Sequence, residues 1–156
     1  MKLIFLTLIL VAALSVAYCV ISSSLKDTYV TEVVINRPYD DVWTWISDPT
    51  KYAKLYPNWV KHVEKKSETI FQIDDQFGHS NEASLKAIKE SGTIDLQIGS
   101  ELSRLRIYPL DENRTAIVHL AKRWKNATFI IWFFHRRTTD KDFENAKQVI
   151  ETEKTN

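Results

Sequence analysis

The sequence predicts an α+β fold, a curved antiparallel sheet with helices on one side. Three observations lead to this prediction: a β-branched run followed by a helical segment near residue 40, a series of short alternating segments, and a helical pattern at the C-terminus. Turn residues separate the alternating segments at spacings that suit hairpins and are too short for crossover helices. The sheet is therefore expected to be antiparallel.

The first strand and the first helix are predicted between residues 30 and 46. Val30–Asn36 is rich in β-branched residues, which indicates a strand with at least one buried face. Pro38 suits the first position of a helix, and the apolar residues of Tyr39–Ile46 recur on one helical face. Asp48 precedes a proline and ends the helix, and Tyr52–Pro57 then leads into the next strand.

The middle of the chain predicts a meander of short strands. Residues 71–77, 94–98 and 104–108 each alternate apolar and polar side chains, whereas residues 85–90 alternate less regularly. Turn residues lie between these segments and before the strand predicted at 115–120, at Gly78–Asn81, Ser91-Gly92, Gly99-Ser100 and Asp111–Asn113.

A terminal helix is predicted to begin near Thr139. Thr139 and Asp142 have the spacing of a capping box, and Phe143, Ala146 and Ile150 recur on one helical face.

Three motifs together resemble the START-related, or SRPBCC, superfamily. They are the strand–helix–break segment Thr31–Val60, the hairpin segment Leu105–Leu120 (LRIYPLDENRTAIVHL) and the closing segment Phe143–Glu151 (FENAKQVIE). The resemblance covers roughly residues 29–153 and implies a helix-grip fold. In that fold two short helices follow the first strand, and the sheet wraps around a long C-terminal helix. The resemblance predicts architecture better than activity, because one fold hosts many functions.

The family's ligand cavity lies between the sheet and the closing helix. The resemblance therefore implies that ligand-binding side chains come from the inward faces of the strands and from the inner sides of the helices. The candidates in this chain are Trp45, Phe71, Ile73, Asp75, Phe77, Ile94, Leu96, Leu105, Ile107, Val118, Trp132 and Phe133.

An uncharged run, Leu3–Ile21, precedes the domain. Its 19 residues would reach about 28 Å as a helix, close to the hydrocarbon thickness of about 30 Å. Residues 1–24 are therefore expected to be a transmembrane anchor, with Lys2 keeping the N-terminus inside and residues 29–153 on the exported side. The alternative is a signal segment that is cleaved near Ala17, which would leave a secreted or periplasmic protein.

Charge and motif content argue against several functions. Lys2 is the only charged residue of the leader, so the remaining 20 basic and 20 acidic side chains balance and nucleic-acid binding is not expected. The three glycines form no phosphate-binding motif, so no nucleotide cofactor is expected. The four histidines lack metal-ligand spacing, so no metal is expected. No residue is assigned a catalytic role, although Asp75 and His119 are the side chains that a cyclase-like enzyme could use as acid or base.

The segment Lys122–Arg137 (KRWKNATFIIWFFHRR) has an unusual composition. Its apolar run, Phe129–Phe134, is flanked by five basic residues and by no acidic one. Such a run can be buried, as a last strand or as the start of the closing helix. It can also lie at a membrane surface, a hypothesis that fails if Trp132 and Phe133 are both fully buried.

The sequence thus leads to a first functional hypothesis, a membrane-anchored protein that binds a hydrophobic small molecule or lipid in the cavity. The second hypothesis is a polyketide cyclase-like enzyme that acts on a hydrophobic substrate. A third is an interaction domain with a collapsed cavity. The absence of a convergent pair of polar residues favours the first over the second.

Overall fold

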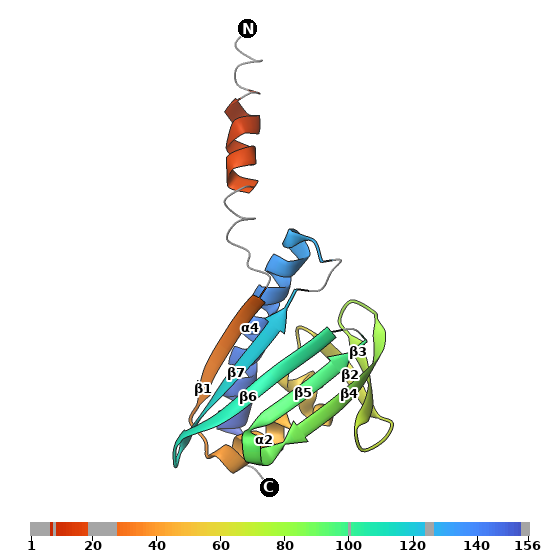
Figure 1. Cartoon of the computed structure of the whole chain (residues 1–156), viewed down its shortest axis with the longest axis vertical. Helices are drawn as coiled ribbons and strands as arrows, with labels where there is room; N and C mark the ends of the chain where they lie inside the picture. The colour runs from red at the N-terminus through yellow and green to blue at the C-terminus, as the bar shows by residue number, and fades with distance from the viewer. Residues whose placement is uncertain (1–6, 8, 19–27, 100, 124–126, 154–156) are drawn as a thin grey trace.

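The computed structural model describes residues 7, 9–18, 28–99, 101–123 and 127–153 of the 156-residue chain. In this part of the chain one antiparallel sheet has the strand order β1-β7-β6-β5-β4-β3-β2, and α4 runs along one face of it (Figure 1). The strands are β1 Thr28–Ile35, β2 Val60–Lys65, β3 Ile70–Asp75, β4 Ser80–Ile88, β5 Thr93–Ile98, β6 Glu101–Asp111 and β7 Arg114–Lys122. The helices are α2 Tyr39–Ile46, η1 Pro49–Lys51, α3 Tyr52–Leu55, η2 Lys89–Ser91 and α4 Phe129–Thr152.

The first strand and the helices after it follow the sequence pattern closely. Strand β1 alternates exposed and buried residues, as its β-branched composition predicts. Pro38 lies at the N-cap of α2, one position before the predicted one, and two aspartates occupy the first turn of that helix. The Asp48 side chain accepts hydrogen bonds from the Thr50 amide at 3.1 Å and from its hydroxyl at 2.6 Å. The Asp-Pro break therefore ends α2 and also caps η1.

The main core lies between one face of the sheet, here called the inner face, and helices α2, α3 and α4. Strands β1 and β3 to β7 contribute alternate residues, β2 contributes Val60, and the three helices contribute their apolar stripes. The fully or almost fully buried members of this core include Ile35, Val42, Ile46, Tyr52, Leu55, Ile73, Ile94, Ile107, Ile117, Ala146 and Ile150. This arrangement confirms the α+β prediction and fits a helix-grip architecture.

The predicted turns join adjacent strands. Gly92 has φ +60°, and a Cβ at this position would lie 2.1 Å from the Ile107 carbonyl oxygen, so glycine is required there. The Gly92 carbonyl accepts a hydrogen bond from the Ile107 amide at 2.8 Å, which links the start of β5 to β6. The turn predicted at Gly99-Ser100 includes Ser100, which lies outside the described residues.

The closing helix begins earlier than predicted. α4 starts at Phe129, where the Thr128 hydroxyl caps it by accepting a hydrogen bond from the Ile131 amide at 3.3 Å. The prediction of a start near Thr139 is wrong, because the Thr139 hydroxyl donates to the His135 carbonyl inside the continuous helix. The apolar run that was assigned either to a last strand or to this helix forms its first turns.

The leader is described only in part. Residues 9–18 are helical, and the rest of the predicted anchor Leu3–Ile21 lies largely outside the described residues. In the described ranges no helix has both the length and the apolar character needed to cross a membrane.

Candidate functional site

A row of inward side chains crosses the middle of the sheet. Strand register pairs Leu85 of β4 with Leu96 of β5, and Leu96 with Ser103 of β6. Because neighbouring strands lie about 4.8 Å apart, Leu85 and Ser103 are about 10 Å from each other along this row. Leu85 is the end of the row nearer to α2, and Ser103 is the end nearer to α4.

A buried histidine lies at the α4 end of this row. His119 of β7 is only 7% exposed, and its Nε2 atom shares a hydrogen bond of 2.8 Å with the Ser103 hydroxyl. Its ring stacks on that of Phe143 of α4, with the ring centroids 5.2 Å apart. Burial, together with the nearby His135, lowers the pKa of His119 from 6.5 to about 4, so the imidazole is neutral at pH 7.

The second nitrogen of His119 has no hydrogen-bond partner in the part of the chain that the structure describes. Among the described residues, this Nδ1 atom and the hydroxyl oxygen of Tyr56 are the two buried side-chain polar atoms that lack a hydrogen-bond partner. The Tyr56 ring also contacts Phe143, at a centroid distance of 5.6 Å. Two unpartnered polar atoms therefore belong to rings that contact one phenylalanine, between the sheet and the helices.

The surroundings of Tyr56 disfavour a negative charge, through burial and through neighbouring groups. Burial raises the pKa of Tyr56 well above 10, and the neighbouring Tyr52 and Asp142 raise it further. Asp142 of α4 is itself buried, which raises its pKa, although its Oδ1 atom accepts hydrogen bonds from the amide and side chain of Asn58 at 2.9 and 2.8 Å. Tyr56 is therefore a neutral hydrogen-bonding group.

A second polar cluster on the inner face has all its hydrogen bonds made. The Tyr29 hydroxyl donates to Asp140 of α4, and the Thr31 hydroxyl also bonds to both. Burial and the bond to Asp140 raise the pKa of Tyr29 to about 12. These bonds hold α4 against β1, and the cluster needs no ligand to complete it.

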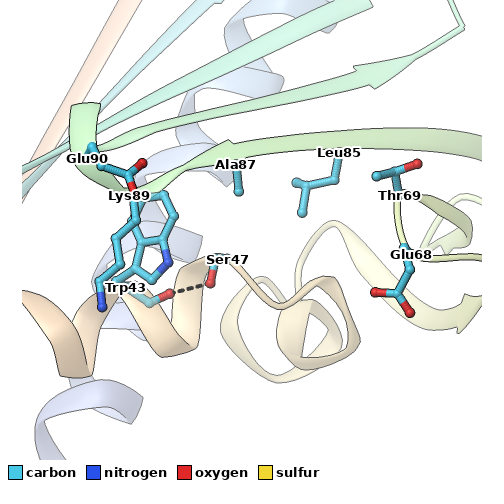
Figure 2. A pocket seen from close by; sticks show the side chains of 8 residues that line it. All are labelled: Trp43, Ser47, Glu68, Thr69, Leu85, Ala87, Lys89 and Glu90. Atoms are coloured by element: carbon cyan, nitrogen blue, oxygen red, sulfur yellow. Dashed lines mark hydrogen bonds between the residues drawn. The ribbon is translucent and has the colours of Figure 1, made fainter.

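An open pocket lies between α2 and β4, as Figure 2 shows. Its volume is about 510 Å³, and its lining residues are Trp43, Ser47, Glu68, Thr69, Leu85, Ala87, Lys89 and Glu90. The Ser47 hydroxyl donates to the Trp43 carbonyl at 2.7 Å, and the Tyr39 hydroxyl donates to the Lys89 carbonyl at 2.6 Å. The pocket shares Leu85 with the row that leads to Ser103, so both belong to one inner face.

The structure brings most of the predicted ligand-binding residues to the inner face but not to this pocket. Seven of the twelve are buried in the main core: Trp45, Phe71, Ile73, Ile94, Leu96, Leu105 and Ile107. None of the twelve lines the described pocket. Contact of these core residues with a ligand stays a prediction.

Three of the remaining predicted ligand-binding residues, Asp75, Phe77 and Val118, lie elsewhere than in the main core. Phe77 is 73% exposed, because β3 ends at Asp75 and the alternation stops there. The Asp75 carboxylate is buried, but it accepts hydrogen bonds from the amides of Phe77 and His79 and contacts the His79 ring at 2.9 Å, so it stabilises the turn. Val118 is half-buried and lies on the face opposite His119. The inward orientation expected for Phe77 and Val118 is therefore wrong.

The last two candidates, Trp132 and Phe133, lie on the first turns of α4. Trp132 is fully buried in a small separate cluster with Tyr29 and Ala121, and Phe133 is partly exposed. The sequence had suggested His119 only as an acid or base. It did not predict that Ser103 and Phe143 contact His119 or that Tyr56 contacts Phe143, although the alternation of β7 placed His119 on the same face as Ile117.

The described residues contain no group of three or more histidine, cysteine, aspartate or glutamate side chains that could hold a metal ion. The Asp75–His79 pair is a contact in an exposed turn and not part of such a group.

Comparisons with solved structures identify the fold. The ZhuI aromatase/cyclase from Streptomyces sp. R1128 superimposes with a TM-score of 0.67 at 16% identity, covering 80% of this chain and 93% of that chain. A START superfamily protein from Mycobacterium smegmatis has a TM-score of 0.59 at 12% identity, covering 80% and 94%. The protein XoxI from Bacillus cereus has a TM-score of 0.67 at 9% identity, covering 81% and 97%.

These likenesses confirm, at the level of the fold, the resemblance to the START-related SRPBCC superfamily. No family model matches the chain, and no curated protein matches its sequence. Sequence identities of 9–16% show only that the fold is shared, so the ligand and the activity must be inferred from the site.

Proposed function

We propose that the chain is a membrane-anchored, non-catalytic protein that binds a hydrophobic small molecule or lipid between its sheet and its C-terminal helix. The observation that carries the proposal is the pair of unpartnered polar atoms, His119 Nδ1 and the Tyr56 hydroxyl, which belong to two rings that contact Phe143. Buried polar atoms in proteins are nearly always hydrogen-bonded. An oxygen-bearing group of a bound molecule would supply the missing partner.

The chemistry around these atoms selects the polar group of the ligand. His119 and Tyr56 are both neutral at pH 7, and the nearest acidic side chain that affects Tyr56 is the buried Asp142. A carboxylate or phosphate placed there would be desolvated without a countercharge, which is costly. A hydroxyl or carbonyl oxygen fits better, because it can hydrogen-bond to an imidazole or a phenol and carries no charge.

The apolar part of the ligand would extend along the inner face. Leu96 separates Ser103 from Leu85, and Leu85 forms a wall of the 510 Å³ pocket beside Trp43 (Figure 2). A volume of this size is within the range of about 300–1,000 Å³ that small-molecule sites occupy. In the proposal this pocket is the opening through which the ligand reaches the space under α4.

The proposal places residues 1–24 in the membrane and the domain on the exported side. Its support is the uncharged run Leu3–Ile21 and the position of Lys2. Cleavage near Ala17, which would release the same binding domain as a secreted or periplasmic protein, is the alternative.

A cyclase-like enzyme is the second candidate function. The buried His119–Ser103 hydrogen bond favours it, and the ZhuI aromatase/cyclase has the same fold. A general base works best when its pKa is near the operating pH, however. The pKa of about 4 makes His119 a weak base at pH 7, so we rank ligand binding first.

The test is native mass spectrometry of the detergent-extracted full chain, followed by organic extraction of whatever is bound. We expect a reproducible apolar mass that contains a neutral oxygen group. His119→Phe keeps a ring against Phe143 but removes the polar atoms, and should raise the dissociation constant about tenfold, the effect of losing one buried hydrogen bond of about 1.4 kcal/mol. The matched control is His62→Phe on the exposed side of β2, which should bind normally.

Two results would contradict the proposal. One is a chain that never retains an apolar molecule and converts a cyclase substrate, which would establish the enzymatic alternative. The other is an equal loss of ligand in His119→Phe and His62→Phe, which would show that ligand binding does not depend on the inner face.

A further inference from the structure

The first two turns of α4 carry apolar side chains on the outside of the domain. Ile130, Ile131 and Phe134 are 52%, 51% and 62% exposed, and Phe133 is 38% exposed. We call these four residues the α4 outer patch. Single exposed apolar residues are common on protein surfaces, but four neighbours on two helical turns are a contiguous patch.

Helical geometry explains why the patch faces away from the domain. With 3.6 residues per turn, Ile130 and Phe134 lie on the side opposite Trp132, and Ile131 and Phe133 lie on the two flanks between them and Trp132. Trp132 is fully buried against Tyr29, with the ring centroids 6.5 Å apart. The condition that would have excluded a surface role, burial of both Trp132 and Phe133, is therefore not met. Farther along the outer side of α4 the exposed residues become polar, at Lys141, Glu144 and Gln148.

Basic residues flank the patch in the sequence. Residues 122–137 contain five lysine or arginine residues and no acidic residue. The Arg137 guanidinium lies over the Phe133 ring at 5.5 Å from its centroid, and Lys122 at the end of β7 is exposed. Aromatic and aliphatic side chains bordered by lysine and arginine are the composition of segments that lie at a lipid headgroup boundary.

The chain itself holds this patch close to the predicted anchor. Thr28, the first residue of β1, pairs with Lys122, and Tyr29 contacts Trp132 of α4. In Figure 1 the start of β1, the start of α4 and helical residues 9–18 all lie towards the same end of the molecule. Residues 22–27 separate the uncharged run from β1, and six residues reach at most about 21 Å.

We infer that the α4 outer patch docks onto the surface of the membrane that holds the anchor, and that anionic headgroups bind its lysine and arginine side chains. The inference rests on the membrane anchor of the proposed function. Six apolar residues in a row are too few to cross a bilayer, so the patch lies in the interface, parallel to the surface. Docking would also fix the domain's orientation, with the first turns of α4 towards the lipid.

The test uses the full chain with 4-fluorophenylalanine at all phenylalanine positions, inserted in phosphatidylcholine nanodiscs with or without phosphatidylglycerol. The fluorine resonances are assigned by single Phe→Tyr variants. Paramagnetic broadening is then measured with a doxyl-labelled lipid and with a water-soluble gadolinium chelate. Phe5 belongs to the predicted anchor, and Phe77, on the exposed β3–β4 turn, is the matched control for Phe134.

We expect the labelled lipid to broaden Phe5 and Phe134 and to leave Phe77 sharp. Phosphatidylglycerol should increase the broadening of Phe134 at least about twofold, and Arg137→Gln should reduce that gain. The inference is overturned if Phe5 is broadened by lipid while Phe134 responds only to the aqueous agent, as Phe77 does. Protection of Phe134 from both agents would also overturn it and would indicate a protein partner. A Phe5 resonance that the labelled lipid leaves sharp would instead show that the proposed anchor is wrong.

Discussion

The two halves of α4 use hydrophobic residues for opposite purposes. The second half places Phe143, Ala146 and Ile150 in the main core at 6%, 0% and 1% exposure. The first half carries the most continuous apolar run of the domain, yet most of its described side chains are exposed. Among its described side chains only Trp132 is fully buried, in a cluster of three residues.

The difference shows that periodicity predicts burial better than total hydrophobicity does. The second half has few apolar residues, but they recur on one face and meet the inner face of the sheet. The first half is apolar on several sides, and the domain can cover only one of them. The surplus apolar surface is what makes a membrane-facing role physically reasonable.

The largest expected effect is a difference in unfolding free energy between one phenylalanine substitution in each half of α4. Phe143→Ala should lower the free energy of unfolding by about 3–5 kcal/mol, because it leaves a cavity between Tyr56 and His119. Phe134→Ala removes the same ring from an exposed site and should change the free energy by less than about 0.5 kcal/mol. Chemical denaturation of the detergent-extracted chain measures both. Equal losses would show that the first half is also part of the core.

Acid should destabilise the domain through a histidine packed on each half. His119 stacks on Phe143 and His135 stacks on Trp132, and burial lowers the pKa of both. With a pKa of 6.5 in the unfolded chain and about 4 in the folded one, the contribution of His119 is fully present above pH 6.5. It is lost as the pH falls towards 4, because the unfolded state then binds the proton more tightly.

The size of the His119 contribution follows from the shift, about 3 kcal/mol at most. The raised pKa of Asp142 acts in the opposite direction, so the measurement compares unfolding free energies of the natural chain and His119→Phe across this pH range. The variant should show a clearly flatter acid dependence, and His135→Phe a smaller change. Parallel curves for the natural chain and His119→Phe would mean that His119 is not desolvated.

Trp132 tests whether the first half can open independently. Trp132 belongs to a small buried cluster with Tyr29 and Ala121, outside the main core, so Trp132→Ala should cost about 2 kcal/mol, less than the same change in the main core. Hydrogen exchange should speed up in the first two turns of α4 and stay slow around Ala146, because local opening leaves the main core intact. Faster exchange along the whole helix would show that the two halves unfold together.

The smallest expected difference concerns one polar contact from each half of α4. The Asn145 side chain donates to the carbonyls of Lys54 and Leu55 at 2.8 and 3.0 Å, so Asn145→Ala should cost about 1 kcal/mol. Thr128→Ala removes the N-cap, which is typically worth about 1 kcal/mol, but fraying confined to the first turn should lower the global value by less. Thermal unfolding compares the two variants, and a larger loss from Thr128→Ala would contradict the distinction.

The sequence predicted the architecture well because local chemistry determines it. The alternation of β1 and the Asp48-Pro49 break are set by neighbouring residues, and the turn at Gly92 is marked in the sequence by a glycine, here at φ +60°. The start of α4 was missed because Thr139 and Asp142 have capping-box spacing while Thr128 provides the actual cap. Inside a longer helix, the threonine hydroxyl bonds to the preceding turn.

The candidate site was less predictable because it depends on contacts between distant segments. His119 meets Ser103 through strand pairing and Phe143 through the packing of α4. No local pattern indicates that Tyr56 reaches the same phenylalanine. The misplacement of Phe77 has a simpler cause, since the sequence does not reveal that β3 ends at Asp75.

Nitrogen NMR of the full chain with ¹⁵N-labelled histidine tests the central claim most directly. The account predicts one imidazole, absent from the spectrum of His119→Phe, that remains neutral until the pH approaches about 4. Its Nδ1 resonance should shift when the co-purified apolar molecule is added to stripped protein. A His119 that titrates near 6.5 and whose Nδ1 resonance does not respond to that molecule would contradict the account.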